Sequence, residues 1–146
     1  MARAIAEAGL LREADWVIPV PLHPTRTAKR GFSQSHLLAH HALRLIGGNT
    51  LSMLRTDLLR RHRPTRPQTE LPPPERQANV AGAFSPAPRR LLRRSAPGAE
   101  PGPALAGSAV LLIDDVLTTG STLDACARTL KSAGARRVSA AVLARA

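Results

Sequence analysis

The stretch AVLLIDDVLTTGSTLDACARTL, residues 109–130, carries the strongest signals in the sequence for both fold and function. It begins with an apolar run typical of a buried strand and ends in a pattern typical of a helix, which starts at about Ser121. Between the two stand a pair of aspartates, Asp114 and Asp115, and a short polar turn at residues 118–122. We therefore expect a strand over 109–114 that carries two acids to its carboxyl end and passes through a tight turn into a helix over 121–133.

Apolar strands alternate with helices along the rest of the chain. Further strands are expected at residues 15–20, 50–54, 79–84 and 137–143, and further helices at 3–11 and 33–47. Ser33 is placed to cap the second of these helices and Gly47 to end it, with an apolar face formed by Leu37, Leu38, His41, Leu45 and Ile46. Strand–helix–strand repeats of this kind predict an α/β fold, a parallel sheet flanked by helices.

The middle of the chain is expected to be irregular. Residues 60–78 are rich in arginine and proline, which argues against a regular core element and predicts a mobile loop. Residues 85–108 have the low-complexity composition of a disordered loop. The 146 residues are the size of one domain, so a single domain over residues 1–146 is expected.

The charge balance narrows the classes of partner. Lysine and arginine number 21 against 10 aspartate and glutamate, and the net charge of +11 suits an anion such as nucleic acid or a polyphosphate. The alternative is a solvated, arginine-rich surface, and aromatic residues at 2% leave little with which to stack unpaired bases.

Two absences in the sequence set further expectations. No segment has the length and hydropathy of a signal peptide or a membrane span, so a cytoplasmic protein without a membrane partner is expected. The single cysteine, Cys126, excludes an internal disulfide and is expected to be a small buried apolar residue rather than a nucleophile.

The turn at residues 118–122 has the features of an anion-binding site. The first N–H groups of a helix have no partner inside the helix, and the helix dipole is positive at that end. Gly120 lets the backbone approach a phosphate closely, and the hydroxyl groups of Thr118, Thr119, Ser121 and Thr122 can add hydrogen-bond donors. Taken alone, such a turn could be an ordinary helix cap.

The neighbouring acids favour a more specific ligand. Carboxylates at Asp114 and Asp115 would repel a phosphate, but they would accept hydrogen bonds from two adjacent hydroxyl groups. A ribose 5-phosphate carries both a phosphate and a vicinal diol. The sequence therefore predicts a ribose-phosphate site at the end of this strand.

The segment VLLIDDVLTTGST, residues 110–122, resembles the signature of type I phosphoribosyltransferases, which bind phosphoribosyl pyrophosphate (PRPP). The segments VIPVPLHPTRTAKRGFSQSHLLA, LLRRHRPTRPQTELPPPERQANVAGAF and VLARA resemble the ComF family of amidophosphoribosyltransferase-like proteins, which are linked to competence for DNA uptake. The similarity runs in order from about residue 4 to residue 146 and departs from the family only in residues 85–108. It implies a type I phosphoribosyltransferase-like fold and the binding of PRPP.

The resemblance also implies roles for individual residues. Asp114 and Asp115 would hold the ribose 2- and 3-hydroxyls at the reacting centre, and residues 118–122 would hold the 5-phosphate. A pyrophosphate loop would contain Pro21, Leu22, His23, Arg26, Lys29 and Arg30, and its three cations suit pyrophosphate unless they form a solvated loop. A flexible loop that closes over the reacting centre would contain Arg63, Thr65, Gln68 and Arg76, with Asn79 fixing its base.

Magnesium is expected to arrive with PRPP, held largely by pyrophosphate, ribose oxygens and water, so no side chain is assigned as a metal ligand. His36 and His40 have the spacing of two zinc ligands on a helix, but neither an accompanying glutamate nor a third ligand is indicated. ComF-like proteins usually begin with a cysteine-rich zinc-binding module, which this sequence does not contain. The module is expected either to be missing from this member or to lie upstream of this start.

Two functions are compatible with these observations. The first is an enzyme that transfers the phosphoribosyl group of PRPP to a nitrogen nucleophile or to water, with magnesium and with release of pyrophosphate. The second is a non-catalytic PRPP sensor or a single-stranded-DNA-binding protein of competence. No general base for an incoming nucleophile stands out, and the resemblance implies a homodimer as one possible assembly.

Overall fold

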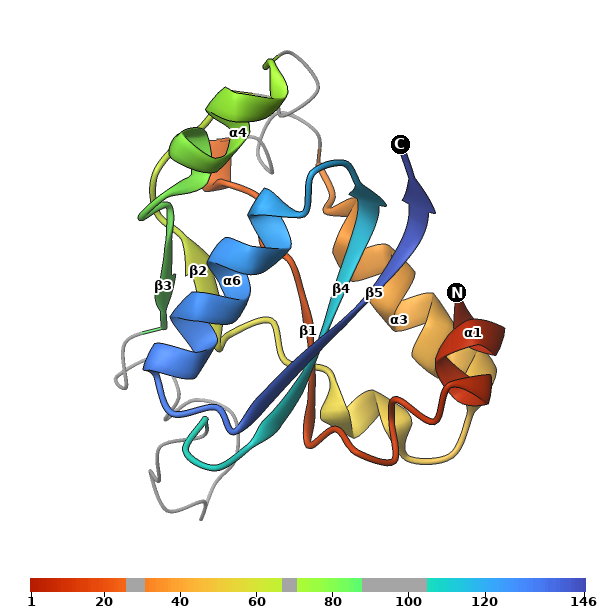
Figure 1. The fold of residues 1–146 in the computed structure, drawn as a ribbon. Helices are drawn as coiled ribbons and strands as arrows, with labels where there is room; N and C mark the ends of the chain where they lie inside the picture. The colour runs from red at the N-terminus through yellow and green to blue at the C-terminus, as the bar shows by residue number, and fades with distance from the viewer. Residues whose placement is uncertain (26–30, 67–70, 88–104) are drawn as a thin grey trace.

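The chain alternates strands and helices in the order expected of an α/β protein (Figure 1). The computed structural model describes residues 1–25, 31–66, 71–87 and 105–146. Its elements are α1 (Ala2–Glu7), β1 (Trp16–Pro19), α3 (Gln34–Ile46), the 3₁₀ helix η1 (Thr50–Met53), β2 (Leu59–Arg61), α4 (Pro73–Val80), β3 (Phe84–Pro86), β4 (Ala109–Leu117), α6 (Ser121–Ser132) and β5 (Arg137–Arg145).

A parallel sheet with the strand order β1-β4-β5 forms the centre of the fold. In the register, Pro19 of β1 lies opposite Ile113 of β4, so the two strands run toward the same edge of the sheet, and β4 continues beside β5 to Leu117. The first five residues of β4 are at most 2% exposed, as expected for a central strand that is covered on both faces. The predicted α/β fold with a parallel sheet flanked by helices is therefore confirmed.

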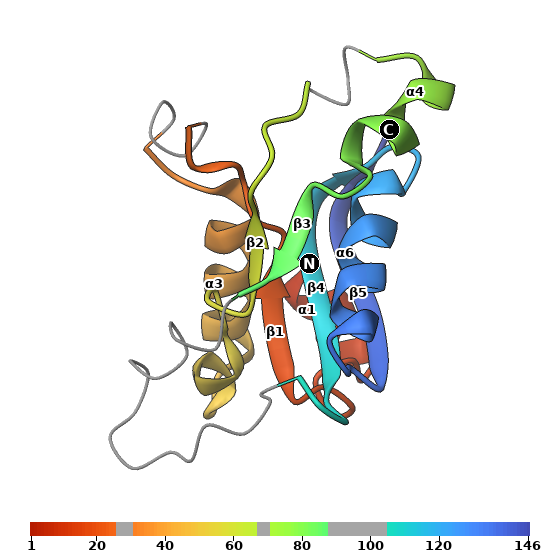
Figure 2. The same ribbon diagram turned by 90° about the vertical axis from the view of Figure 1, so that its left-hand side faces the viewer.

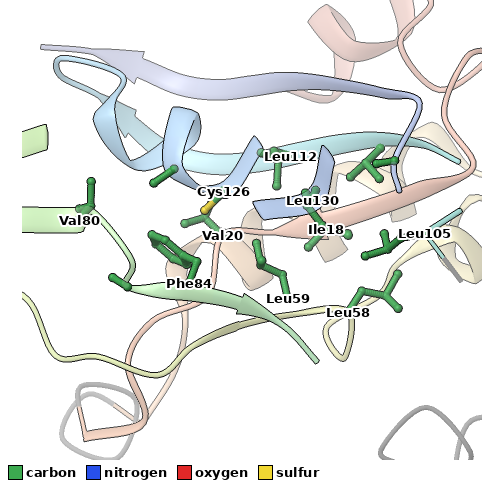
Figure 3. Close-up of a cluster of buried hydrophobic side chains, with 14 residues drawn as sticks. Ile18, Val20, Leu58, Leu59, Val80, Phe84, Leu105, Leu112, Cys126 and Leu130 are labelled. Atoms are coloured by element: carbon green, nitrogen blue, oxygen red, sulfur yellow. The ribbon is translucent and has the colours of Figure 1, made fainter. Parts of the chain in front are cut away.

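Helices cover the two faces of this sheet (Figure 2), with α3 on one side and α6 on the other. Because side chains alternate along a strand, Val110 and Leu112 join a cluster with α6, whereas Leu111 and Ile113 join a second cluster with α3 and α1. Cys126 of α6 lies in the first cluster beside Leu112 (Figure 3). This cysteine is 0% exposed, which confirms the prediction that it is a buried apolar residue.

A small antiparallel sheet of β2 and β3 closes the α6 side of the core. Leu59 and Phe84 from these strands pack into the same cluster as Ile18 and Leu130 (Figure 3). The connection between the two strands carries α4, which contacts α6 and lies beyond the carboxyl end of β4 (Figures 1 and 2). The middle of the chain thus stands over the sheet edge where β1 and β4 end.

Two of the strands predicted for this middle region are wrong. Residues 50–53 form η1 rather than a strand, because the Thr50 hydroxyl donates to the carbonyls of Leu43 (2.8 Å) and Gly47 (3.0 Å) and holds a tight turn after α3. Residues 79–80 end α4 instead of beginning a strand, and β3 starts only at Phe84.

The segment 60–78 is not irregular throughout. It begins in β2, and most of α4 lies inside it. The prolines that suggested a broken structure stand in the first turn of α4, where proline fits because the first N–H groups of a helix need no partner inside it. The predicted mobility of this segment stays a prediction. Most of the low-complexity segment, residues 88–104, lies outside the described part of the chain, whereas residues 85–86 belong to β3.

Helix α3 is capped as predicted but turns a different face to the core. Ser33 accepts a hydrogen bond from the His36 N–H, and Gly47 ends the helix with φ at +81°. The side chains buried by α3 are Ser35, Ala39, Ala42 and Leu43, while Leu37 and Leu45 are 45% and 80% exposed and His41 is exposed. Leu38 and Ile46 are half-buried against the core as expected. The buried face of the helix is therefore rotated relative to the predicted one, and it packs Ala39, Ala42 and Leu43 against the sheet.

Candidate functional site

The carboxyl end of β4 places Asp114 between the two helix layers. Its Oδ1 accepts hydrogen bonds from Ser35 Oγ of α3 (2.8 Å) and from the Asp115 N–H (3.0 Å). On the α6 side, its charge acts on the thiol of Cys126. Asp114 is 9% exposed, whereas Asp115 is half-buried and accepts from the Val116 N–H at 2.8 Å.

The surroundings of Asp114 change its acidity. Burial raises the pKa of Asp114 to about 6, because loss of water disfavours the charged carboxylate. The hydrogen bonds from Ser35 and from the Asp115 backbone oppose this rise, and the neighbouring charge of Asp115 adds to it. Burial also raises the pKa of the Cys126 thiol, with a further contribution from Asp114. Cys126 is therefore a poor nucleophile.

The turn after β4 leads directly into α6. Gly120 is the N-cap residue with φ at +79°, so no side chain caps the helix there. A Cβ at Gly120 would come no closer than 3.6 Å to Leu117 Cδ1. The backbone dihedral angle, and not lack of space, is thus what favours glycine. The hydroxyls of Thr119 and Ser121 lie 2.7 Å apart at the mouth of this turn. Oriented N–H groups and hydroxyls at a helix N-terminus are suited to an anion.

The loop after β1 starts beside this site, because the Val20 N–H donates to the carbonyl of Ile113 at 2.9 Å. The structure therefore brings Pro21, Leu22 and His23 to the same sheet edge as Asp114. The Nδ1 atom of His23 lies 2.8 Å from Thr25 Oγ1 and accepts from the Thr25 N–H at 3.3 Å. The three cations predicted for this loop, Arg26, Lys29 and Arg30, lie outside the described residues.

The structure describes three of the four residues predicted for the flexible loop. Each of them forms hydrogen bonds within the part of the chain that runs from β2 to β3. Arg63 Nη2 donates to the carbonyls of Asn79 (2.9 Å) and Ala81 (2.6 Å). Arg76 Nε donates to the carbonyl of Leu71 at 2.9 Å, and the buried Thr65 hydroxyl accepts from Arg61. Gln68 lies outside the described residues. In this conformation Arg63, Thr65 and Arg76 shape the segment and do not reach Asp114.

Two buried polar residues near the site were not singled out from the sequence. In the sequence Ser35 is one residue of the helix expected over 33–47, whereas in the structure its hydroxyl donates to Asp114. Arg61 is 8% exposed, and its guanidinium lies 5.4 Å from the centroid of the Phe84 ring. A polar residue two positions after the helix cap was a signal that could have drawn attention to Ser35.

No group of three or more His, Cys, Asp or Glu side chains is arranged to hold a metal ion within the described ranges. A magnesium ion held largely by a bound phosphate compound and by water would need no such group of side chains.

A cavity in the described part of the structure lies away from this site. It has a volume of about 410 Å³ and opens between the outer side of α6 and the chain around β3. Its walls include Phe84, Ala125 and Thr129, but neither Asp114 nor the turn at 118–122. This cavity is therefore not the candidate site.

The sequence matches a known family and several known proteins. A family model described as phosphoribosyl transferase domain matches residues 45–146. The chain is 31% identical over 136 residues to Competence protein F of Haemophilus influenzae, which covers 93% of this chain and 52% of that protein. It is 59% identical over 39 residues to an adenine phosphoribosyltransferase of Rhodococcus jostii, and equally similar to one of Rhodococcus opacus, over 27% of this chain and 22% of each enzyme.

These matches bear on the predictions made from the sequence. The resemblance to type I phosphoribosyltransferases and to ComF-like proteins is confirmed, and so is the fold that it implied. The chain spans about half of the length of Competence protein F. None of the helices in the described part of the chain is both long and apolar enough to cross a membrane.

Proposed function

The chain belongs to the phosphoribosyl transferase domain family, and from this premise we propose that it binds PRPP at the carboxyl end of β4 and transfers the phosphoribosyl group with release of pyrophosphate. One observation carries the proposal. A buried, hydrogen-bonded carboxylate at Asp114 stands a few residues before an uncapped helix N-terminus at Gly120, at the edge of a parallel sheet. Ligands of open α/β sheets bind at this edge.

Each part of the ligand has a matching group in the chain. Because Oδ1 of Asp114 already accepts two hydrogen bonds, Oδ2 is the oxygen that would accept a ribose hydroxyl. Asp115 would accept the adjacent hydroxyl. The N–H groups at the start of α6, with the hydroxyls of Thr119 and Ser121, would hold the 5-phosphate.

The leaving group would lie toward the loop that begins at Pro21. The bond between ribose C1 and pyrophosphate would break as a bond to the nucleophile forms, pyrophosphate would keep the electron pair, and the nucleophile's proton would pass to pyrophosphate or solvent. Magnesium bound with PRPP would neutralise part of the pyrophosphate charge. The protein's contribution would be orientation of the sugar and stabilisation of the developing charge.

Calorimetric titration of PRPP tests this proposal. We expect saturable binding that strengthens with Mg²⁺ and is lost in the double variant Asp114→Asn/Asp115→Asn. The matched control is Asp15→Asn, at the opposite end of β4, where an amide oxygen can still accept from the Ala109 N–H. A folded wild-type protein that does not bind PRPP would contradict the proposal.

Turnover needs a separate assay. We expect pyrophosphate release from PRPP with at least one acceptor among purine bases, pyrimidine bases, ammonia and water. Release with none of these acceptors, together with tight PRPP binding, would favour the non-catalytic sensor.

A second function is favoured by the charge of the molecule. The net charge of +11 suits a nucleic acid, and one similar protein is named Competence protein F. In this alternative the chain binds single-stranded DNA and uses the ribose-phosphate site for sensing, without turnover. A homodimer and a cytoplasmic location belong to either proposal.

A further inference from the structure

The contact between Ser35 and Asp114 joins two distant parts of the chain. Ser35 lies in the first turn of α3, is 5% exposed, and donates its hydroxyl hydrogen to Asp114 Oδ1 at 2.8 Å. The second bond to Oδ1 comes from the adjacent Asp115 backbone. Ser35 is therefore the donor that another element of the fold contributes to this carboxylate.

The position of Ser35 links the two halves of the proposed ligand site. Helix α3 is the element that follows residues 21–30, the segment assigned to the pyrophosphate. It also packs against β4, whose carboxyl end carries Asp114. The amino end of α3 carries a partial positive charge, which favours a carboxylate at this place.

We propose that Ser35 is a positioning residue for Asp114: its hydroxyl fixes the orientation of the carboxylate, favours its ionised form and ties the ribose side of the site to helix α3. The part that concerns PRPP rests on the proposed function. The part that concerns Asp114 does not, because it describes the protein without ligand.

The hydrogen bond from Ser35 is important for the charge of Asp114, because it favours the ionised carboxylate against the effect of burial. Burial, with a smaller contribution from the charge of Asp115, raises the pKa of Asp114 to about 6, while the hydrogen bonds from Ser35 and from the Asp115 backbone act in the opposite direction. From α6, the buried Cys126 faces the same carboxylate, and Arg61 of β2 lies near that thiol. A hydrogen bond to an ionised group favours that form by an amount that corresponds to about one pKa unit or more. Loss of Ser35 would thus protonate much of Asp114 near neutral pH.

The first test follows the titration of Asp114 without ligand. The ¹³C signal of its carboxyl group, assigned by its loss in Asp114→Asn, is measured against pH in wild type, Ser35→Ala, Ser35→Thr and Ser33→Ala. We expect the midpoint to rise by about one pH unit in Ser35→Ala. Ser35→Thr, which keeps a hydroxyl, should remain near the wild-type midpoint.

Ser33→Ala is the matched control, because Ser33 caps the same helix without touching Asp114. It should lower the melting temperature slightly and leave the midpoint unchanged. An unchanged midpoint in Ser35→Ala, or an equal rise in Ser33→Ala, would overturn the proposal.

The second test measures Mg–PRPP binding by calorimetry at pH 6.5 and 8.5. For Ser35→Ala we expect a loss of affinity of about threefold or more at pH 6.5, and a smaller loss at pH 8.5, where Asp114 is ionised in both proteins. An equal loss at the two pH values would overturn the role of Ser35 in keeping the charge. If the wild type does not bind PRPP, the proposed function fails, while the titration without ligand still decides the role of Ser35.

Discussion

At the scale of single residues, Asp114 is an acidic side chain in a buried position. It is buried among core side chains, and burial raises its pKa to about 6. Because the ionised form is less stable in the folded protein than in the unfolded chain, the contribution of Asp114 to folding stability is most favourable below about pH 4 and falls as pH rises from about 4 to about 6. A residue kept at such a cost is expected to serve ligand binding.

Replacement of this carboxylate should therefore stabilise the protein. We expect Asp114→Asn to raise the free energy of unfolding at pH 7 by up to about 3 kcal/mol, equivalent to two pKa units, and to have no such effect at pH 4. Urea denaturation of both proteins between pH 4 and pH 8 measures the difference. Stability curves that run parallel over this range would contradict the prediction.

Gly120 is the second residue on which the candidate site depends, because it forms the turn before α6. With φ at +79°, an alanine there would be strained by about 1–2 kcal/mol and would shift the N–H groups that open α6. We expect Gly120→Ala to lose both stability and affinity for PRPP in calorimetry. Gly107→Ala is the control, because Gly107 has φ at +69° with no atom within 4 Å and lies at the other end of β4. It should lose similar stability and retain affinity, and an equal loss of affinity would show that strain alone explains the effect.

At the scale of elements, the segment between β2 and β3 is held at its base by side-chain contacts to the backbone. Asn79 uses both ends of its amide on Arg66, accepting from its N–H at 3.2 Å and donating to its carbonyl at 3.0 Å. Arg63 bonds the last carbonyls of α4. These contacts join residues 63–66, which follow β2, to α4 and the chain that leads into β3.

Loss of the Asn79 amide should open this base. We expect Asn79→Ala to speed amide hydrogen exchange in residues 62–66 by about 5- to 30-fold, the equivalent of 1–2 kcal/mol, while β4 stays protected. Hydrogen exchange followed by mass spectrometry measures both regions. Gln77→Ala, on an exposed position of the same helix, should leave the exchange unchanged. Equal exchange in wild type and Asn79→Ala would refute a role for this contact.

At the scale of the whole molecule, a net charge of +11 contrasts with a candidate site that begins with two acids. The net charge of +11 raises the local concentration of any anion, whether PRPP or a polynucleotide. The site and the charge can therefore serve different ligands. Salt dependence separates them, because each phosphate contact on a single strand lowers log K by about 0.7 per decade of salt.

If the alternative function holds, binding to an oligothymidylate should weaken steeply with salt, with a slope of about −2 or steeper for three or more contacts. Fluorescence anisotropy between 50 and about 300 mM salt measures the slope. The double variant Asp114→Asn/Asp115→Asn should bind the oligonucleotide at least as well as wild type, since it removes two negative charges. Binding that is weak and insensitive to salt would rule out this function.

The sequence alone determined the order of the central elements and the identity of the strand that carries the site. The apolar run before Asp114 is long enough only for a buried strand, and Gly120 permits the one turn that joins it to α6. These features are local, so they can be read from neighbouring residues. The same applies to the Ser33 cap and to the burial of Cys126.

Only the tertiary structure decided which residues meet across long separations in the chain. Ser35 and Asp114 are 79 positions apart, and no periodic pattern announces their contact. The packing of neighbouring elements also decides that Leu37 and Leu45 are exposed. It likewise decides that the prolines of α4 begin a helix, and that Arg63 and Arg76 donate hydrogen bonds to backbone carbonyls. Local patterns fix the elements, but burial and hydrogen-bond partners are set by what the fold packs against them.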